Sequence, residues 1–566
     1  MTAETTRPKK KVSIFKKKPF IVGGISGIIA IMGIVIGINL YFNISHPEVV
    51  LVFGTQYNPS FIDPLAAYAE SDVNLIDQVA EGLFDYNYSS EFFEPIPNLA
   101  KNFSWNNNAT ELTCYLRENV LFHDGTKFDA TAVKWNFERI NRLINHTDFA
   151  ASHLWLLPDG RTIINRTQVL DDYTIKFILN APYVPFKALL SSWTSYILSP
   201  ESTPADDFID LLSGKLVGTG PFIYDIYEYP EKLSLSTNSN YWGVKPKIDK
   251  LIFFVVGTNP VRVEAMLSGE IHMLVDISFN ETTLDSFRNN SEFTVQEGML
   301  DAKFNFLIMN NKLINTTMRK AISFAFNYSY WLDLLQVVRA KSPLPEVILY
   351  YNITGLKTPY CNISIARQTL KDAGWPGTSS LTVNNNISTG NEWEKLVEDG
   401  IPLATYNFSY FPEAWWKALS GPLAENLKQI GVKIENANMS FGQWLDIMNE
   451  ESGYHRNMLG LTYTGWIADF NDPSTFVNPY FTNKVPAVNC GQVNDTLTQQ
   501  WMEEALGESN EISRENLYYK IQKRLIEDVF PHVWLWTSTR TDIYISNLRG
   551  WYSNPYKLVF KSVYFV

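Results

Sequence analysis

The chain of 566 residues is too long for one typical hydrophobic core, so two or three domains are expected. Its formal net charge is -12, but residues 1–18 carry +6, which leaves -18 for the rest. An acidic body argues against nucleic acid as a partner. Aromatic residues make up 14% of the chain, which favours a ligand pocket lined with rings in addition to packed cores.

The basic start of the chain is followed by an uncharged apolar stretch. Residues 19–42 are dominated by Ile, Val and Gly and are long enough to cross a bilayer as a helix. Lysines crowd its amino side, which predicts that residues 1–18 form a cytoplasmic tail and that the chain from Asn43 onward lies outside the cell. A cleaved signal peptide is the alternative, but no Ala-x-Ala site follows and no cysteine is placed for lipidation. We therefore expect an uncleaved single-pass membrane anchor.

Glycosylation motifs support export. Asn-x-Ser/Thr occurs sixteen times, whereas chance at this composition gives roughly six, and every site lies beyond the apolar stretch. The sites are Asn43, Asn87, Asn102, Asn108, Asn145, Asn165, Asn280, Asn289, Asn315, Asn327, Asn352, Asn362, Asn386, Asn407, Asn438 and Asn494. This excess predicts a glycosylated extracellular domain.

The three cysteines give no metal signature. Cys114 lies in an alternating strand pattern, and Cys361 and Cys490 are candidates for a disulfide outside the cell. No Cys-x-x-Cys, His-Glu-x-x-His or Gly-x-Ser-x-Gly motif is present, so neither a metal, a cofactor nor hydrolytic catalysis is expected.

Helices and strands alternate most regularly in the second half of the chain. Residues 304–309 and 432–435 read as strands, and helices are predicted at 317–335 and 497–529. Two more helices, at 366–373 and 423–430, end at glycines in the C′ position. Earlier, Asp129 is expected to cap a helix. No Gly/Ser-rich hinge appears, so we expect two α/β lobes joined by strands.

A candidate binding motif lies at residues 464–473, Thr-Gly-Trp-Ile-Ala-Asp-Phe-Asn-Asp-Pro. The apolar run before it predicts a buried strand, and Asn471-Asp472-Pro473 ends that strand. Asp469 beside the indole of Trp466 suits a ligand with a cationic group and an apolar body. On these ten residues alone, a strand end with a solvated aspartate is the simpler interpretation.

Several motifs, taken in order, resemble the dipeptide/oligopeptide-binding family of extracytoplasmic solute-binding proteins that serve ABC importers. They are Tyr115–Lys134 (YLRENVLFHDGTKFDATAVK), Val217–Phe222 with Asn240–Gly243 and Lys245–Asp249, Leu267–Glu270, Met318–Ile322, Ala366–Pro376 and Gly465–Pro473. One such match is weak, but this series covers much of the predicted extracellular part.

The resemblance implies a two-lobed α/β clamshell of the type II periplasmic-binding-protein kind, with an extra subdomain on lobe I. Lobe I would comprise 48–84, 205–302 and 532–566, the inserted subdomain 85–204, and lobe II 303–531. The protein would be a monomer, would not be an enzyme, and would deliver its ligand to ABC permease subunits.

The resemblance also implies site residues. In peptide-binding members, the aspartate of the Trp-x-Ala-Asp motif holds the ligand's α-ammonium, which would be Asp469 here. The backbone of Gly465 and Ile467 would bind an extended peptide, and Trp466 would form a pocket wall. The remaining cleft positions would be Asp276, Phe306, Phe441 and Tyr463, although core packing is equally plausible for Phe306 and Phe441.

The chain departs from the family pattern at the motif. Tyr463 stands where some oligopeptide binders have an arginine, and Ile467 where they have a cysteine. No arginine for a ligand carboxylate is evident, so peptide length stays open. An oligosaccharide receptor of the same family and a surface receptor without a transport role remain alternatives.

Overall fold

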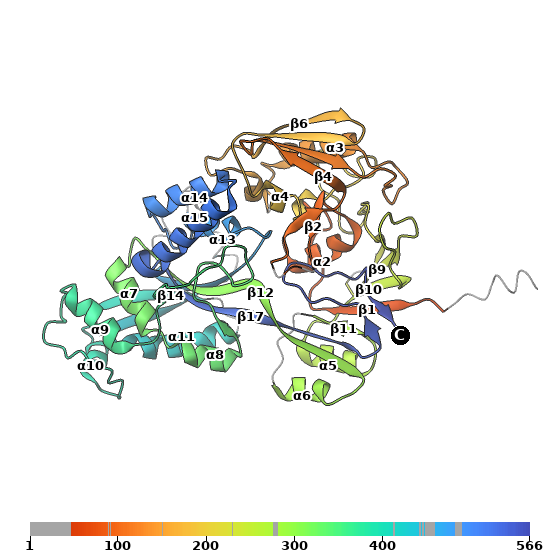
Figure 1. The fold of residues 1–566 in the computed structure, drawn as a ribbon. Helices are drawn as coiled ribbons and strands as arrows, with labels where there is room; N and C mark the ends of the chain where they lie inside the picture. Colours follow the sequence, from red (N-terminus) through yellow and green to blue (C-terminus); the bar gives the residue numbers. More distant parts are fainter. Residues whose placement is uncertain are drawn as a thin grey trace, which may run out of the picture. The chain divides into compact units, whose positions relative to one another are not determined.

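A computed structural model describes residues 47–88, 90, 92–149, 151–228, 230–275, 281–410, 414–440, 443, 447, 459–481 and 489–566 (Figure 1). Met1–Val49 and Val50–Val566 form two separate units. The predicted tail (1–18) and anchor (19–42) lie outside the described residues, as do Asp276, Phe441, Asn43 and Asn280. Within the described ranges, no helix combines the length and apolar character that a bilayer crossing needs.

A central sheet of eleven strands runs through the Val50–Val566 unit, which gives the mixed α/β architecture that the sequence predicts. Its main path follows the order β15 (Val432–Asn438), β14 (Ala404–Tyr410), β16 (Leu461–Ile467), β12 (Phe293–Met309), β17 (His532–Ile545), β11 (Met273–Leu274), β1 (Val50–Thr55), β10 (Lys250–Val255), β9 (Lys232–Thr237) and β8 (Phe222–Glu228). β13 (Val338–Arg339) pairs with β17 off this path.

The antiparallel strands β12 and β17 belong to both halves of this sheet. β17 pairs with β11 through Tyr544, on the side that we call the β1 half, and β12 pairs with β16 through Phe304, on the side that we call the β16 half. Their mutual pairing is irregular at three places, between Asn305 and Phe306, between Leu300 and Phe304, and between Glu297 and Met299. The intervening Gly298 has φ +87, a conformation that glycine adopts at a bulge without steric cost. The halves are thus joined by strands.

A second sheet, of four strands, is built from the segment that precedes β8. It contains β4 (Ala100–Trp105), β5 (Glu111–Leu116), β7 (Thr174–Leu179) and β6 (Ile164–Asp171), in that spatial order. α3 (Ala130–Leu143) packs on it, with the rings of Phe137 and Phe177 4.7 Å apart. Asp129 caps α3 as predicted, because its carboxylate accepts from the backbone N–H groups of Thr131 and Ala132. This sheet therefore has an apolar core of its own.

The remaining regular elements are two small sheets and a set of helices. The two-stranded sheets pair β2 (Phe84–Tyr86) with β3 (Pro95–Pro97) and β18 (Leu548–Arg549) with β19 (Tyr564–Phe565). The helices are α2 (Glu70–Val79), α4 (Phe186–Leu189), α5 (Asn259–Leu267), α6 (Glu281–Arg288), α7 (Thr316–Ala325), α8 (Tyr328–Leu335), α9 (Ile363–Asp372), α10 (Glu392–Glu398), α11 (Ala414–Lys428), α13 (Ser474–Phe481), α14 (Thr496–Gly507) and α15 (Glu511–Arg524), with the single turns η1 (Ser152–Trp155), η2 (Trp193–Ser195) and η4 (Leu525–Val529).

Two predicted long helices are each broken, so those predictions are wrong in detail. The helix expected at 317–335 divides into α7 and α8, because Phe326 is extended and Asn327 caps a new helix at the N–H of Tyr330. The helix expected at 497–529 divides into α14, α15 and η4, and Asn510 caps α15 in the same way. In both cases an asparagine side chain competes with the helix for backbone hydrogen bonds.

The possible disulfide between Cys361 and Cys490 is not formed. None of the three cysteines, all of which lie in the described residues, is in a disulfide: Cys490 is buried in the apolar core beneath β16, whereas Cys361 is exposed and its sulfur lies 3.9 Å from the carbonyl oxygen of Ala325. The pairing inferred from cysteine count alone is therefore corrected.

The surface suits the predicted sugar attachment. Every sequon asparagine within the described ranges is exposed or half-buried.

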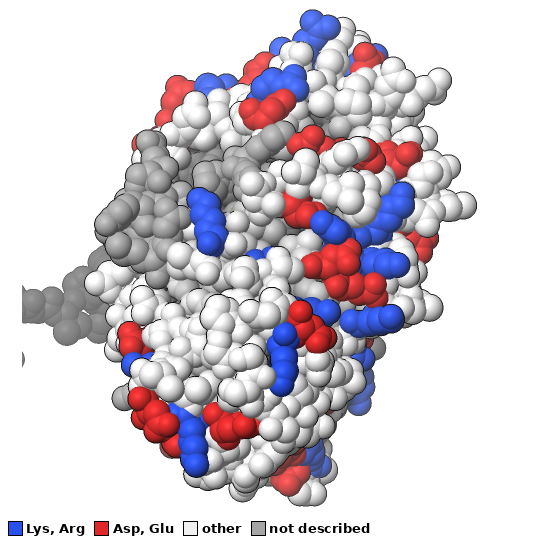
Figure 2. Space-filling model, turned by 90° about the vertical axis from the view of Figure 1, so that its left-hand side faces the viewer, with Lys and Arg blue, Asp and Glu red and all other residues white. Residues whose placement is uncertain are grey.

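On the face drawn in Figure 2, lysines and arginines are interspersed with acidic side chains. On this face, such mixing of signs gives no extended positive field for a polyanion.

A buried ion pair fixes the four-stranded sheet to the loop before α2. Arg139 on α3 makes two contacts with the Asp63 carboxylate, at 2.5 and 3.1 Å, and both side chains are almost fully buried. Asp63→Ala should lower the free energy of unfolding by about 3–5 kcal/mol, because it leaves the guanidinium buried without its partner.

The exposed pair of Arg142 with Asp206 (3.1 Å) on the same helix provides the control, since Asp206→Ala should cost less than about 1 kcal/mol. Urea denaturation measures both. Equal effects of the two substitutions would contradict the assigned role of Asp63.

Candidate functional site

Asp469 follows the end of β16 at the middle of the central sheet. β16 pairs antiparallel with β12, from Leu461 opposite Met309 to Ile467 opposite Lys303. The strand therefore includes Trp466 and ends before the Asn471-Asp472-Pro473 turn. Asp469 is the second residue after it, close to the irregular region where β12 passes between the two halves of the sheet.

The rest of the motif holds this carboxylate in place from both sides. Asp472 pairs with Arg514 of α15 at 2.8 Å, and both side chains are only 4% exposed. The amide of Asn471 donates to the backbone carbonyls of Phe92 and Phe93, the latter at 3.1 Å, in the segment that leads into β3. Asp469 is thus positioned by groups from distant parts of the chain.

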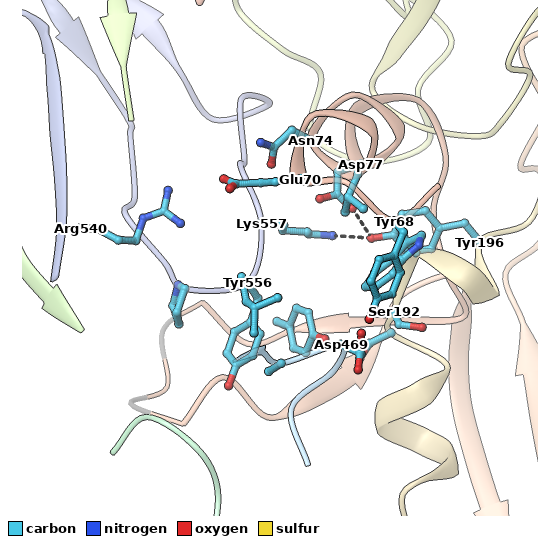
Figure 3. A pocket seen from close by; sticks show the side chains of 17 residues that line it. Tyr68, Glu70, Asn74, Asp77, Ser192, Tyr196, Asp469, Arg540, Tyr556 and Lys557 are labelled. Carbon is cyan, nitrogen blue, oxygen red and sulfur yellow. Dashed lines mark hydrogen bonds between the residues drawn. The ribbon is translucent and has the colours of Figure 1, made fainter. Parts of the chain in front are cut away.

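Asp469 opens onto a cavity with about 790 Å³ of space, part of it continuous with solvent (Figure 3). Most of its lining residues come from four distant segments: Tyr68, Glu70, Asn74 and Asp77 on or before α2; Ser192, Trp193 and Tyr196 at η2; Ile467, Ala468 and Asp469 at and after the end of β16; and Arg540, Tyr556 and Lys557 from β17 and the chain beyond it. Aromatic surfaces with a few charged groups are typical of small-molecule sites.

The Asp469 carboxylate is buried with one of its oxygens unpartnered among the described residues. It is 5% exposed, and its Oδ2 atom has no hydrogen-bond partner among the described residues. Burial raises the pKa of this group to about 8, which its own backbone N–H counteracts only in part. At neutral pH the empty site therefore favours the protonated acid, and a cationic ligand group would favour ionisation.

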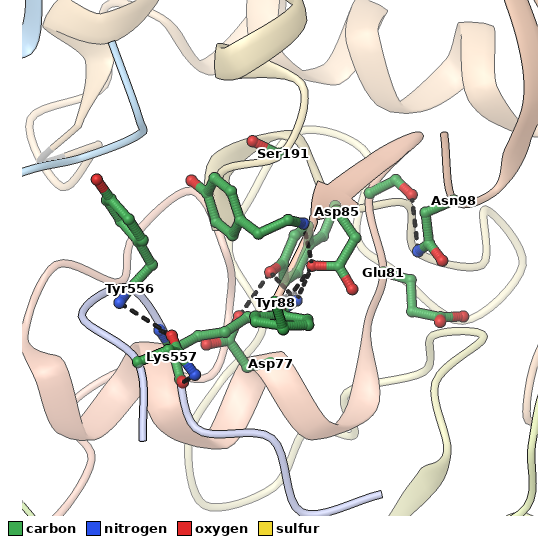
Figure 4. Close-up of polar contacts among 12 residues, drawn as sticks. Asp77, Glu81, Asp85, Tyr88, Asn98, Ser191, Tyr556 and Lys557 are labelled. Atoms are coloured by element: carbon green, nitrogen blue, oxygen red, sulfur yellow. Dashed lines mark hydrogen bonds and ion pairs between the residues drawn. The ribbon is translucent and has the colours of Figure 1, made fainter. Parts of the chain in front are cut away.

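A second acid–base group lies deeper along the same wall (Figure 4). Lys557 Nζ contacts Asp85 Oδ1 at 2.6 Å, and the Tyr196 hydroxyl donates to Asp77 Oδ1 at 2.6 Å. Burial opposes ionisation of Asp85, but Lys557 outweighs this effect and holds its pKa below the usual range. For Asp77, burial dominates over Lys557 and raises the pKa to about 6. Lys557 is therefore neutralised within the protein.

The structure places the predicted site residues in different environments. Ile467 and Asp469 line the cavity, and Ile467 is 45% exposed. Trp466 is half-buried and is not among the lining residues: its indole N–H donates to the Thr475 carbonyl at 2.8 Å, and its ring packs on Tyr480. Gly465 lies opposite Asn305, whose side-chain oxygen is 2.8 Å from where a Cβ would stand.

Phe306 and Tyr463 are buried in the core and are not among the residues that line the cavity. Phe306 is 1% exposed and stacks on Phe304 and His532. Tyr463 is 2% exposed and packs edge-on against Phe408. Both lie on strands in the middle of the sheet, where helices cover both faces and alternation no longer distinguishes a pocket from a core.

Sequence reasoning missed most of the cavity wall. Tyr68, Trp193, Tyr196, Arg540 and Tyr556 lie in segments without a distinctive motif, and they meet only through the tertiary fold. The aromatic richness of the chain was the one available signal. Among the described residues, no group of three or more His, Cys, Asp or Glu is placed to hold a metal ion.

The raised pKa of Asp469 predicts that the free energy of unfolding of the ligand-free protein depends on pH. The pKa of Asp469 is about 8 in the folded protein and near 4 in the unfolded chain. The protonated carboxyl group therefore contributes fully to the stability of the folded protein below about pH 4, and this contribution is lost as the pH rises towards 8. Relative to wild type, Asp469→Asn should therefore gain stability with increasing pH, by at most about 1.4 kcal/mol per pH unit.

Urea denaturation of the ligand-free protein between pH 5 and 8 measures this difference. Asp333→Asn, at an exposed position on α8, should show no such trend. A difference between Asp469→Asn and wild type that stays constant with pH would contradict the raised pKa.

Comparison with known proteins identifies the family. The family described as "Bacterial extracellular solute-binding proteins, family 5 Middle" matches residues 94–486, more than half of the chain. The glutathione-binding protein GsiB of Pectobacterium atrosepticum is 23% identical over 521 residues, which cover 90% of this chain and 92% of that protein.

Solved structures share the fold. The periplasmic binding protein DppA from Helicobacter pylori, in complex with the peptide STSA, superposes with a TM-score of 0.70 at 23% identity and covers 92% of this chain and 98% of its own. NikA from Brucella suis, in complex with Fe(III)-EDTA, gives 0.75 at 20% identity, with coverage of 91% and 100%. The resemblance read from the sequence motifs is thereby confirmed: the chain belongs to the family 5 extracellular solute-binding proteins, which are binding proteins and not enzymes.

Proposed function

We propose that this protein captures short peptides, or peptide-like molecules with a free amino group, by pairing their ammonium with Asp469. The unpartnered, buried carboxylate oxygen of Asp469 in the cavity carries the proposal. A buried carboxylate is costly alone, and a charge-assisted hydrogen bond from an ammonium offsets that cost. The relatives named for glutathione and crystallised with the peptide STSA accord with such a ligand, whereas the NikA complex shows that fold alone does not set ligand class.

The edge of β16 supports binding of an extended backbone. β14 pairs with β16 at Phe408–Ser409 and Leu461–Thr462, and within the described residues the pairing does not extend to Gly465 or Ile467. Backbone groups on that side of β16 can therefore accept a ligand as an added strand. Gly465 and Ile467 remain the proposed positions.

Aromatic walls favour an oligosaccharide as a second candidate. Tyr68, Trp193, Tyr196 and Tyr556 line the cavity, and aromatic rings also suit the binding of sugars. A neutral sugar, however, leaves Asp469 without a cation, so peptide is the better match. A surface receptor with the same ligand but no transport role would use the same site.

Ligand capture would couple to closure of two lobes and delivery to an ABC permease. The proposed lobes are lobe I (48–84, 205–302 and 532–566, with the subdomain 85–204) and lobe II (303–531). The cavity takes residues from both, including Tyr68 and Asp469, so a ligand that contacts both favours the closed state. β12 and β17 would provide the hinge, at their register irregularities.

Residues 19–42 would tether this receptor to the membrane, with residues 1–18 in the cytoplasm, the binding domain outside and glycans on the sequon asparagines. The uncharged stretch, the flanking lysines and the exposure of the described sequons support this arrangement.

Chemical blocking of the ligand's amine tests the peptide assignment. A library of dipeptides and tripeptides, each free and N-acetylated, is screened by thermal shift and then by calorimetry. N-acetylation should weaken binding at least about 100-fold in wild type, because truncating a buried charge pair costs about 3 kcal/mol or more. In Asp469→Asn, the free and acetylated forms should bind similarly weakly.

Neutral cello- and manno-oligosaccharides form the second arm of the screen. Stabilisation by these sugars without any effect of free peptides would show that the peptide assignment is wrong. Asp333→Asn serves as the charge-matched control and should bind as wild type does.

The anchor is tested by expression of the full chain in its own membrane system. The protein should resist extraction by alkaline carbonate, and intact-mass analysis after deglycosylation should retain residues 1–42. A mature protein that lacks these residues and is released by carbonate would establish the cleaved signal peptide instead.

A further inference from the structure

A second carboxylate of the cavity wall shares the unusual surroundings of Asp469. Asp77 lies on α2 and lines the same cavity (Figure 3). Its Oδ1 atom accepts a hydrogen bond from the Tyr196 hydroxyl at 2.6 Å, whereas its Oδ2 atom is buried and has no hydrogen-bond partner among the described residues. Because buried polar atoms in folded proteins are nearly always hydrogen-bonded, such an oxygen at a cavity wall is a candidate for contact with a ligand.

The packing of α2 fixes the direction in which Asp77 points. Glu70, Asn74 and Asp77 follow one another at spacings of four and three residues, which places them on one side of the helix, and all three line the cavity. Leu75 and Val79 lie on the other side of α2 and are buried in the core. The apolar side of the helix therefore holds the polar side against the cavity.

The basic group that acts on Asp77 is shared with other acids. Lys557 contacts Asp85 at 2.6 Å. Burial raises the pKa of Asp77 to about 6, and Lys557 counteracts burial only in part. A smaller cavity, which Asp77 also lines, contains three acidic and two basic side chains: Asp77, Glu81, Asp85, Lys557 and Lys561. This part of the wall has one acid more than it has bases, so one further cation completes its charge balance.

Two buried carboxylate oxygens of the main cavity thus share one property. Oδ2 of Asp77 and Oδ2 of Asp469 are both buried, and neither has a hydrogen-bond partner among the described residues. Arg540, the other basic residue of the cavity wall, lies beside Asp542, with 4.0 Å between its Nε atom and Oδ1. A ligand with two cationic groups would give each of the two carboxylates a charge-assisted hydrogen bond.

We propose that Asp77 binds a second cationic group of the ligand, so that the cavity selects peptides with a basic side chain such as that of lysine. This inference rests on the proposed function, in which Asp469 takes the α-ammonium, and it names the substrate class more narrowly. The Tyr196 hydroxyl holds the Asp77 carboxylate in place through Oδ1, and Oδ2 receives the side-chain ammonium. An apolar side chain at the same place would leave Oδ2 buried without a partner.

The test uses side chains that differ in charge but little in shape. Dipeptides and tripeptides of alanine receive one lysine at each position in turn, and each is matched by the peptide with norleucine, which has the same carbon chain without the amine. All are prepared free and N-acetylated. Calorimetry measures their affinities for the full chain in detergent, as wild type, Asp77→Asn and Asp469→Asn. Asp333→Asn, at an exposed position on α8, is the control, and thermal unfolding verifies that each variant is folded.

At one position, lysine should bind wild type at least about 30-fold more tightly than norleucine, because its ammonium meets a desolvated carboxylate. In Asp77→Asn this preference should fall below about 3-fold, while the norleucine peptide keeps its wild-type affinity within about 3-fold. Asp333→Asn should retain the full preference. In Asp469→Asn both peptides should bind more weakly, and the preference for lysine should persist.

Two results would overturn the proposal: norleucine peptides that bind wild type as well as lysine peptides do, or a preference for lysine that is unchanged in Asp77→Asn. In either case a penalty for N-acetylation would leave the role of Asp469 intact. Failure of the proposed function would look different, since N-acetylation would then have no effect in wild type. Should Asp77→Asn fail to fold, Asp77→Ser, which keeps a hydrogen-bonding group for Tyr196, is measured in its place.

Discussion

The proposed site depends on the burial of one carboxylate, that of Asp469, which is energetically unfavourable. Asp469 is removed from water at the end of β16, and its outer oxygen has no hydrogen-bond partner among the described residues. A protein whose only requirement was stability would place an apolar residue here. The neighbouring contacts of Asp472 with Arg514, and of Asn471 with Phe92 and Phe93, fix the turn that follows Asp469. The fold thus keeps Asp469 in an environment that disfavours its charge. In the proposed function, the ammonium of the ligand offsets this cost.

The position of Asp469 also links the proposed ligand binding to the arrangement of the two halves of the central sheet. Asp469 comes from the β16 half of the sheet, whereas Tyr68, Tyr196 and Arg540 come from α2, η2 and the far part of β17. β12 and β17 are shared by both halves and are irregular between them. In the proposed mechanism, a ligand that spans the cavity adds contacts to both sides of these strands, which is the energetic requirement for closure.

The sequence was informative where a function depends on a contiguous motif. The turn after β16, the carboxylate at its end, the glycine after α9 and the cap of α3 are local features, and each was predictable from neighbouring residues. Phe306 and Tyr463 pack in the core, and the sequence could not separate core from cleft positions here because strands buried on both faces lose the alternation of apolar and polar residues. Arg540 and Tyr556 could not be predicted, since an arginine in an ordinary strand and a tyrosine in a terminal loop acquire meaning only when the chain brings them opposite Asp469.

Proton release on binding tests the central claim most directly. In the empty protein Asp469 has a pKa of about 8, so at pH 7 it is largely protonated, and an ammonium ligand should displace that proton. Calorimetry of a short peptide in buffers of different ionisation enthalpy should show nearly one proton released per ligand at pH 7 for wild type and none for Asp469→Asn. Binding of the peptide to wild type with no proton exchanged would contradict the account.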